Sequence, residues 1–289
     1  MVQLSARVLA RGTADERNAF ERELGIAQAR LTVKASFGFA DAVIEGDLAR
    51  NDPLRDAYLR LRATEHLRFY GGQFKAPFMQ RVLESSWDLP RIGRGLVEQF
   101  VTDDHQLGGR RLGVMAEGRF KQLSGLRISG GLFQGATDLE GNRTGEDAAA
   151  RVSFRPWKPL TLASSAYLAE LAEGVRRFAT GGDATLKLGG LTVTAEALFG
   201  RLAVGRFSSQ NALVTYDVPV GALWVLQPIL GVEGLQLRGA QAGVAWGGTA
   251  GLNAIWNERL RVQLQGQRMQ RPGDQGPGND LGVQVGAKF

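Results

Sequence analysis

The feature that most constrains this chain is an alternation of apolar and polar residues with period two, repeated in segment after segment. The C-terminal segment is the clearest, because Leu281, Val283, Val285 and Phe289 fall on one face and the residues between them on the other. Such alternation is typical of β-strands whose two faces meet different surroundings. The chain is therefore predicted to be all-β.

The alternating segments are also long. Most run about nine to eleven residues, the span that a tilted strand needs to cross a bilayer, whereas strands of soluble proteins average about five or six. Counts of fourteen or twelve strands would also satisfy the pattern, but the segments number sixteen when they are placed at 2–10, 24–34, 38–47, 54–62, 67–74, 108–119, 125–134, 147–156, 160–169, 179–188, 191–201, 210–218, 222–231, 240–253, 259–270 and 280–289.

The connections between these segments alternate in length. Tight turns such as Gly189-Gly190 lie at every second position, and the longer polar connections between them include residues 11–23, 135–146, 170–178, 202–209 and 271–279. Short periplasmic turns and longer exterior loops are typical of outer-membrane barrels. We expect one domain, residues 1–289, folded as a transmembrane antiparallel up-and-down β-barrel of about sixteen strands in the bacterial outer membrane.

Composition excludes several other classes of protein. No stretch reaches the roughly 18 uncharged apolar residues of a membrane helix, and the 39 glycines suit closely packed strands in a barrel with a wet lumen. The absence of cysteine removes thiol nucleophiles and thiolate metal sites, and only His66 and His105 carry an imidazole. We expect no enzymatic activity, no cofactor and no bound metal.

Arginine dominates the charged residues. The 35 basic residues include 29 arginines, whose planar guanidinium groups suit carboxylate and phosphate. By alternation the lumen receives fourteen basic residues, namely Arg7, Arg30, Lys34, Arg60, Arg62, Arg68, Arg111, Arg119, Arg127, Arg151, Arg155, Lys187, Arg259 and Arg261. The lumen also receives seven acidic residues, namely Asp41, Glu45, Asp47, Glu117, Asp147, Asp183 and Glu196. Such an excess favours anions, unless the arginines merely pair with the acids in a general pore.

The most distinctive sequence motifs lie between residues 54 and 118. It contains LRDAYLRLR, LRFYGGQFKAPF and SSWDLPRIGRGLVEQFVTDDHQLGGRRLGVMAEG, and near the C-terminus GLNAIWNERLRVQLQGQ precedes the final Phe289. These segments, about a third of the chain, resemble the phosphate-selective porin O and P family of Gram-negative outer membranes. The resemblance implies a homotrimeric sixteen-stranded channel for small anionic solutes, with its third exterior loop folded into the pore. It also implies that Phe289 is recognised by the barrel-assembly machinery.

The loop that the resemblance places inside the pore is residues 75–107, the longest connection in the chain. Its apolar residues, among them Phe78, Trp87 and Ile92, need a surface to pack against, and the inner barrel wall would supply one. Phosphate-selective members use several lysines at the constriction, whereas this loop has only Lys75, so we expect a weak to moderate anion preference. The candidate residues for the constriction and for anion contact are Lys75, Arg81, Arg91, Arg94, Arg60, Arg62, Arg68, Arg111, Arg119, Arg127, Arg151 and Arg155.

Aromatic residues next to short turns indicate the membrane boundary. Trp157 and Trp256 flank such turns, and Phe289 ends the chain. Amphipathic rings prefer the headgroup level, so these residues are expected at the membrane interface. The expected partners on the outside of the barrel are membrane lipid and lipopolysaccharide.

Three other interpretations compete with a channel. A non-conducting barrel with a structural, adhesive or hydrolase role remains the main alternative, although His66 and His105 fall at opposite rims of the expected barrel. The acidic clusters at Asp15-Glu16 and at residues 103–105 fall in exterior loops, where carboxylates are usually solvated. The Gly-Gly-Arg-Arg segment at 108–111 and the pI of about 10.0 suggest nucleic acid, but the basic residues are spread along the whole chain, so no nucleic-acid partner is expected.

Overall fold

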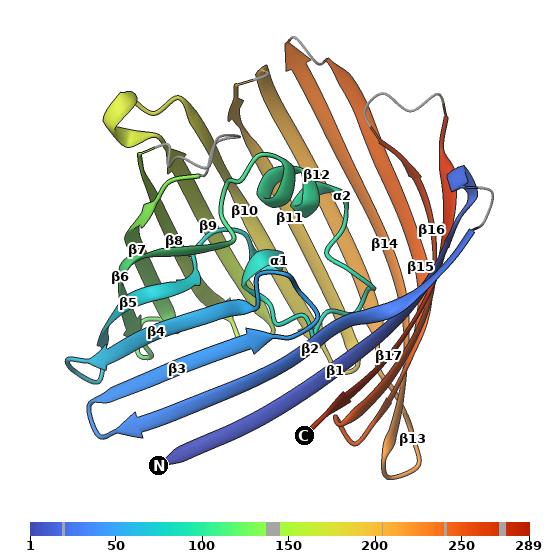
Figure 1. Cartoon of the computed structure of the whole chain (residues 1–289), viewed down its shortest axis with the longest axis horizontal. Coiled ribbons are helices and arrows are strands. Elements are labelled where there is room, and N and C mark those ends of the chain that lie inside the picture. The colour runs from blue at the N-terminus through green and yellow to red at the C-terminus, as the bar shows by residue number, and fades with distance from the viewer. Residues whose placement is uncertain (19–20, 137–144, 204, 240–241, 272–275) are drawn as a thin grey trace.

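The fold is described from a computed structural model, in which residues 1–18, 21–136, 145–203, 205–239, 242–271 and 276–289 are placed. These residues form one antiparallel sheet that closes into a barrel (Figure 1). The strands are β1 Val2–Asp15, β2 Glu21–Phe37, β3 Ala40–Asp47, β4 Leu54–Arg62, β5 Leu67–Lys75, β6 Arg110–Phe120, β7 Leu126–Gln134, β8 Glu146–Trp157, β9 Leu160–Ala169, β10 Arg177–Leu188, β11 Leu191–Leu202, β12 Gly205–Tyr216, β13 Val218–Val220, β14 Trp224–Gly239, β15 Gly243–Trp256, β16 Leu260–Gln270 and β17 Gly278–Lys288.

The barrel has sixteen strands, as predicted, because β12 and β13 act as one. Both pair with β14, and only Asp217 separates them. Each strand otherwise pairs with its neighbours in sequence, and β1 closes the barrel by pairing with both β2 and β17. An even number of strands puts both termini at the same rim, where Figure 1 shows them.

Two connections are shorter than the sequence suggested. Residues 11–23 mostly extend β1 and β2, which stay paired out to Asp15 and Glu21, and β11 is joined to β12 only two residues after Leu202. Both segments are polar, as expected, but much of each belongs to a strand. Where a strand extends beyond the bilayer, its backbone stays hydrogen-bonded to the neighbouring strand while its side chains meet water. The expected connections at 135–146 and 271–279 lie partly outside the described residues.

Helical segments are short and lie in the connections. They are η1 Glu16–Asn18, α1 Gln80–Leu83, α2 Leu96–Glu98, the π-helical turn η2 Gln99–Asp104 and η3 Leu171–Glu173. No helix in the described part of the chain has the length and apolarity that crossing a membrane requires.

The period-two alternation determines which side chains face the lumen. Large aliphatic side chains project outward and are exposed, such as Leu230 and Val232, each 61% exposed. Charged residues between them project inward, and Asp41 and Asp147 are fully buried there. An exposed aliphatic outer surface is unfavourable in water and favourable in hydrocarbon, so the outer face of the barrel suits a membrane.

The inner wall has two chemically different halves. Strands β9 to β15 present buried apolar side chains to the lumen, including Tyr167, Leu198, Phe207, Leu235 and Leu237. Strands β1 to β6 present charged ones, including Arg7, Arg30, Glu45 and Arg60. An apolar segment inside the lumen can bury most of its side chains against the first half, which favours an aqueous passage along the second.

Gly72 lets β4 and β5 approach closely on the charged side. Its φ is +128°, and a Cβ there would lie 2.3 Å from the carbonyl oxygen of Ala57. Only glycine fits such a position. The close pairing directs the end of β5, with Phe74 and Lys75, toward the barrel interior.

Candidate functional site

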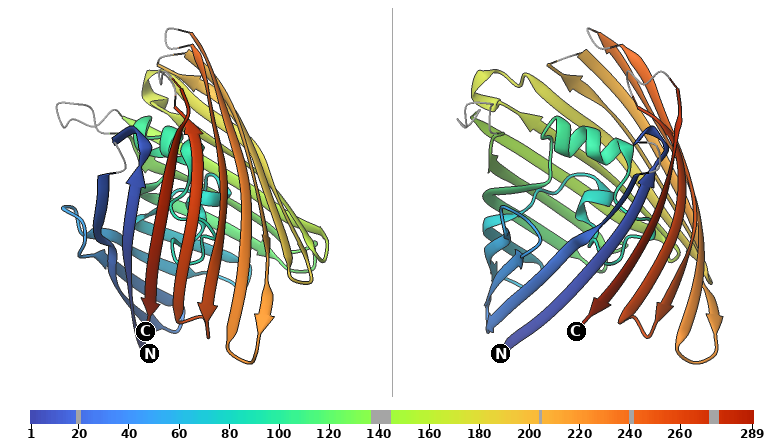
Figure 2. Two further views of the ribbon diagram at one scale, coloured as in Figure 1. Left: turned by 90° about the vertical axis from the view of Figure 1, so that its right-hand side faces the viewer. Right: turned by 45° about the vertical axis from the view of Figure 1, so that its right-hand side comes forward.

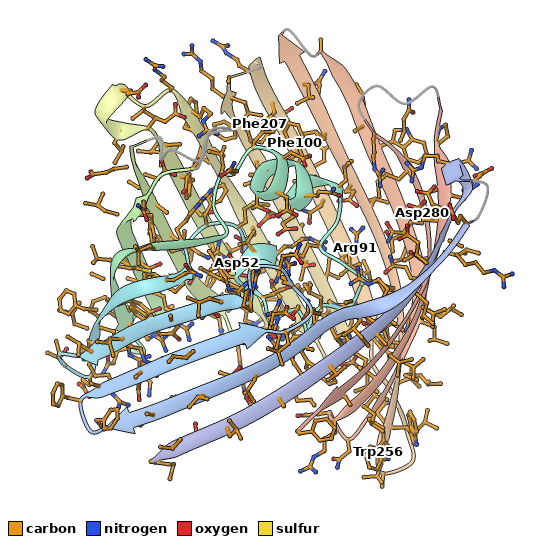
Figure 3. The ribbon with its side chains drawn as sticks, in the orientation of Figure 1. Asp52, Arg91, Phe100, Phe207, Trp256 and Asp280 are labelled. Atoms are coloured by element: carbon orange, nitrogen blue, oxygen red, sulfur yellow. The ribbon has the colours of Figure 1, made fainter. Side chains whose placement is uncertain are left out.

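The connection between β5 and β6 lies inside the barrel, as Figures 1 and 2 show. Phe78, Met79, Val97, Val101 and Leu107 of this connection are fully buried in one cluster with the apolar inner wall. The rings of Phe78 and Tyr167 lie 5.6 Å apart, and those of Phe100 and Phe207 lie 5.9 Å apart (Figure 3). Burial of these side chains holds residues 76–109, called here the inner loop, against β9 to β15.

Polar contacts fix the same face of the inner loop. The guanidinium of Arg91 pairs with the carboxylate of Glu233 at 2.9 Å, and both side chains are almost fully buried. Arg81 Nε donates to Asn211 Oδ1 at 2.9 Å, and the backbone N–H of Gln80 donates to Glu196 at 2.7 Å. Breaking a buried pair by removing one partner typically costs about 3–5 kcal/mol, so these contacts strongly favour a single loop position.

A second set of wall residues binds the backbone of the loop. Arg261 donates to the carbonyl of Trp87 at 2.5 Å, and Asn253 donates to that of Pro90 at 2.7 Å. The backbone N–H of Ile92 in turn donates to Gln265 at 2.8 Å. Side chains of β15 and β16 thus satisfy buried backbone groups at Trp87, Pro90 and Ile92, which helps an irregular segment lie inside a membrane barrel.

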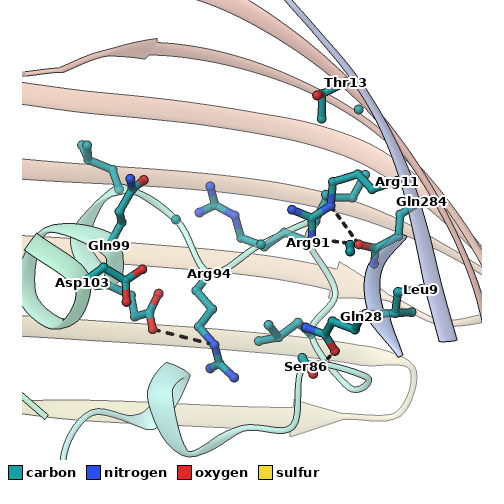
Figure 4. Close-up of a pocket in the computed structure, with 18 of the residues that line it drawn as sticks. Leu9, Arg11, Thr13, Gln28, Ser86, Arg91, Arg94, Gln99, Asp103 and Gln284 are labelled. Atoms are coloured by element: carbon teal, nitrogen blue, oxygen red, sulfur yellow. Dashed lines mark hydrogen bonds and ion pairs between the residues drawn. The ribbon is translucent and has the colours of Figure 1, made fainter. Parts of the chain in front are cut away.

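Two cavities remain between the inner loop and the charged wall. The larger, of about 960 Å³, is lined by β1, β2, β16, β17 and the loop, and Figure 4 shows Arg11, Arg91 and Arg94 around it. The smaller, of about 430 Å³, includes Tyr58, Tyr70 and Met115. The two cavities share three lining residues, Arg30, Lys75 and Arg110, all of them basic. We call these three residues the basic collar.

The arginines of the basic collar are held by carboxylates. Arg110 binds Asp56 with two hydrogen bonds of 2.9 and 3.1 Å, and Arg30 binds Asp47 at 3.0 Å. Glu45 lies between them and accepts from both, at 3.0 Å from Arg30 and 3.2 Å from Arg110. This network fixes the two guanidinium groups in position and neutralises much of their charge.

Lys75 differs from the two arginines because, among the described residues, no carboxylate pairs with it. Its ammonium donates to the backbone carbonyls of Leu83 and Glu84, at 3.2 and 2.6 Å. Arg11 and Arg55 likewise line the larger cavity without an ion pair to any carboxylate that the structure describes. These three side chains add positive charge to a passage whose lining has more basic than acidic residues.

Glu98, at the end of α2, is an acid whose charge depends on pH near neutrality. Burial raises the pKa of its carboxyl to about 7, and nearby Asp103 acts in the same direction, whereas Arg94 opposes the shift. Arg94 Nε is 3.7 Å from the Glu98 carboxylate, and its Nη2 is bound to the carbonyl of Glu84. Glu98 lines the larger cavity, so the charge that its carboxyl gains above this pKa lies in the passage.

We predict that anion preference falls as the pH rises from 6 to 8, because Glu98 then adds a negative charge to the passage. Glu98→Gln should weaken this dependence and keep more of the low-pH preference at pH 8. Asp104→Asn, which alters an exposed carboxylate of the same loop, should leave the dependence in place. Reversal potentials measured at several pH values would test this, and an unchanged pH profile in Glu98→Gln would contradict it.

The sequence-predicted site residues fall into three groups. Lys75, Arg91, Arg94 and Arg111 line the larger cavity, although Arg91 is also engaged with Glu233. Arg81 anchors the loop to the wall. The others lie on the strands: Arg60 and Arg62 pair with Asp41, Arg68 and Arg119 with Glu117, and Arg151 with Asp183, while Arg127 lies near Arg119 and Arg155 is exposed at the end of β8.

Several basic residues of the passage were not among those candidates, namely Arg11, Arg30, Arg55 and Arg110 among others, although Arg30 was expected to face the lumen. Arg55 is the extra residue of a β-bulge, since Asp56 pairs with Glu45 and Leu54 with Gly46. A bulge redirects a side chain that simple alternation assigns to the other face. Arg110 follows Gly108 and Gly109, which have φ of +92° and +75° and turn the chain inward before β6 begins. The Gly-Gly pair was the one sequence signal for this placement.

The predicted interface aromatics lie at the rim that carries the termini. Trp157 ends β8, Trp256 ends β15 opposite Trp224, and Phe289 is 79% exposed beside Ala6. Figure 3 shows Trp256 near this rim. Their position fits an interfacial role, which stays a prediction.

The two histidines do not form a catalytic group. His66 lies in the short turn after β4, where its Nδ1 is 3.0 Å from the carbonyl of Arg119, and the ring of His105 packs on Phe100 in the inner loop. Within the described part of the chain, no cluster of three or more His, Asp or Glu side chains could hold a metal ion.

Several bacterial channels share this fold. OprB of Pseudomonas putida superposes with a TM-score of 0.75 and 10% identity, over 100% of this chain and 94% of that one. The anion-selective porin of Comamonas acidovorans gives 0.69 and 15%, over 100% and 99%. The outer membrane channel DcaP of Acinetobacter baumannii gives 0.69 and 12%, over 100% and 97%.

These comparisons concern the fold, because all three identities are low. They confirm the predicted sixteen-stranded barrel and the predicted location in the bacterial outer membrane. No protein-family model and no curated protein matches the chain. Membership of the phosphate-selective porin family therefore stays a prediction.

Proposed function

We propose that this protein is an outer-membrane porin that lets small hydrophilic solutes diffuse through its lumen and favours anions. The observation that carries the proposal is the basic collar, where the two cavities beside the inner loop share only Arg30, Lys75 and Arg110. Basic rings in a pore select for anions. One structure of the same fold belongs to an anion-selective porin.

The proposed route follows the charged half of the lumen. A solute would enter the larger cavity from the long-loop side, pass the basic collar, and leave through the smaller cavity toward the rim of the termini. The inner loop would form the constriction, since it fills the apolar half. Phosphate and similar small anions fit this charge, but the unpaired cations number only a few, so we propose preference and not strict selectivity.

The oligomeric state and assembly belong to the same proposal. We propose a homotrimer in which each barrel conducts by itself, because the basic collar is built entirely from one chain. Phe289, exposed after β17, would be the signal read by the barrel-assembly machinery. In this proposal the protein performs no chemical reaction.

We predict that the refolded barrel conducts in planar bilayers and shows anion preference under a salt gradient. The positive charge of Arg11, Arg55 and Lys75 is the reason, and the sign of the reversal potential is the measurement. Heat-modifiable migration on gels would verify that the barrel is folded. A folded barrel without conductance would support a structural or adhesive role, and cation preference would refute the proposed selectivity.

A further inference from the structure

Three arginines stand side by side on the outer face of the barrel. In the ladder, Arg201 of β11 lies directly opposite Arg206 of β12, and Arg206 lies directly opposite Arg238 of β14. Their side chains are exposed, whereas their neighbours Leu202, Phe207 and Leu237 are buried inside. The three guanidinium groups therefore project outward in one row, called here the arginine row.

The arginine row has no counter-charge from the protein. None of its members forms an ion pair with a carboxylate in the described part of the chain, and the one side-chain hydrogen bond runs from Arg238 to Gln236 at 3.4 Å. Like charges placed directly opposite each other destabilise a sheet. An external anion bound across the row would relieve this repulsion.

The row lies at the rim of the long loops. Arg201 is next to the last residue of β11, and Arg206 and Arg238 are each one residue from an end of their strands, at the edge of the barrel opposite the termini (Figure 1). Phe178 and Phe199 join the arginines in lining an outer cavity of about 530 Å³. This rim corresponds to the exterior side of an outer-membrane barrel.

A hollow in the apolar belt continues below the row. Directly cross-strand, Gly182, Ala197, Gln210, Gly234 and Trp246 form a line across β10, β11, β12, β14 and β15. The small residues of this line, Gly182, Ala197 and Gly234, leave a groove of about 1110 Å³ on the outer face, bordered by Leu162 and Val244. The groove and the upper cavity share Ser208 and Gln236, so they are continuous.

We propose that this surface binds lipopolysaccharide, with a headgroup phosphate on the arginine row and an acyl chain in the groove. Guanidinium groups bind phosphate oxygens in pairs of charge-assisted hydrogen bonds. A basic pocket that opens directly into an apolar groove matches a molecule with phosphate at one end and hydrocarbon at the other. The site faces away from the lumen, so it is independent of the proposed channel function.

The headgroup contact can be tested with Arg201→Gln, Arg206→Gln and Arg238→Gln combined. Binding of bisphosphorylated lipid A to the detergent-solubilised barrel, followed by native mass spectrometry, should weaken roughly a hundredfold, about fivefold for each arginine removed. Arg268→Gln, an outward-facing arginine of β16 that lines neither outer cavity, is the matched control and should bind normally. Equal binding by the triple variant and the control would overturn the proposal.

Two further experiments distinguish the contribution of the headgroup to binding from that of the acyl chain. Dephosphorylated lipid A should bind the native protein and the triple variant equally weakly. Gly234→Leu, whose side chain would enter the groove beside Gln210, should weaken lipid A while leaving single-channel conductance unchanged. Binding of dephosphorylated lipid A as tight as that of the bisphosphorylated form would contradict a phosphate site.

Discussion

Lys75→Gln combined with Arg55→Gln should remove most of the anion preference. Each change deletes a positive charge that has no carboxylate partner, so neither leaves an uncompensated acid behind, and glutamine retains a donor for the carbonyls of Leu83 and Glu84. A unit charge about 4 Å from a passing ion contributes about 1 kcal/mol even in water. We expect the anion-to-cation permeability ratio to fall by about fivefold for each charge removed.

The matched control is Lys121→Gln combined with Lys158→Gln. These lysines lie in the short turns after β6 and β8, outside both cavities, and the net charge changes by the same amount. Screening over about 10 Å at 0.1 M salt should leave the reversal potential near the native value. If both double variants shifted it equally, selectivity would depend on overall charge and not on the passage.

Removing the inner loop should increase conductance on the order of twofold or more, because an unfilled sixteen-stranded barrel leaves an aqueous channel. Replacement of residues 78–107 by a short glycine-serine turn is geometrically reasonable, since the backbone N–H of Ala76 already donates to the carbonyl of Gly109 at 2.9 Å. The charged wall of the passage would remain, and the inner loop that faces it would be lost. Anion preference should therefore weaken as the wider lumen screens the wall charges.

A shortened exterior connection is the control for this deletion. Removing Leu171–Glu173, between β9 and β10, changes a loop whose side chains do not fill the lumen passage and should leave conductance unchanged. Single-channel recording gives the result, and heat-modifiable migration verifies both barrels. Unchanged conductance after loss of residues 78–107 would mean that the inner loop does not limit ion flow.

Much of the barrel was predictable because alternation is a local property. The bounds of β4 and β9 agree with the sequence prediction to the residue, and the other barrel strands differ mainly at their ends. Strands such as β12 and β14 extend farther than predicted, to Gly205 and Gly239, because ladder hydrogen bonds continue beyond the apolar belt. Nothing in the local pattern marks where a strand leaves the bilayer but stays paired.

The candidate site was only partly predictable. The sequence singled out Lys75 and Arg94 through their place in the long loop, and both line the larger cavity. It also singled out Arg81 and Arg91, whose guanidinium groups instead bind Asn211 and Glu233 of the wall. Whether an arginine faces water or a buried acceptor depends on what the facing strand presents, and that strand lies more than a hundred residues away.

The period-two pattern can be seen in the amino-acid order alone, and it predicted the strands, their two faces and the even count that closes the barrel. The folded barrel was needed to show that Arg30, Lys75 and Arg110 line both cavities, that a bulge turns Arg55 inward, and that Arg201, Arg206 and Arg238 align on the outer face. The physical reason is that backbone pleating acts between neighbouring residues, whereas register, closure and loop packing bring together residues far apart in the chain. The arginine excess thus became three separate features: carboxylate-paired wall charges, a basic passage and an outward-facing row.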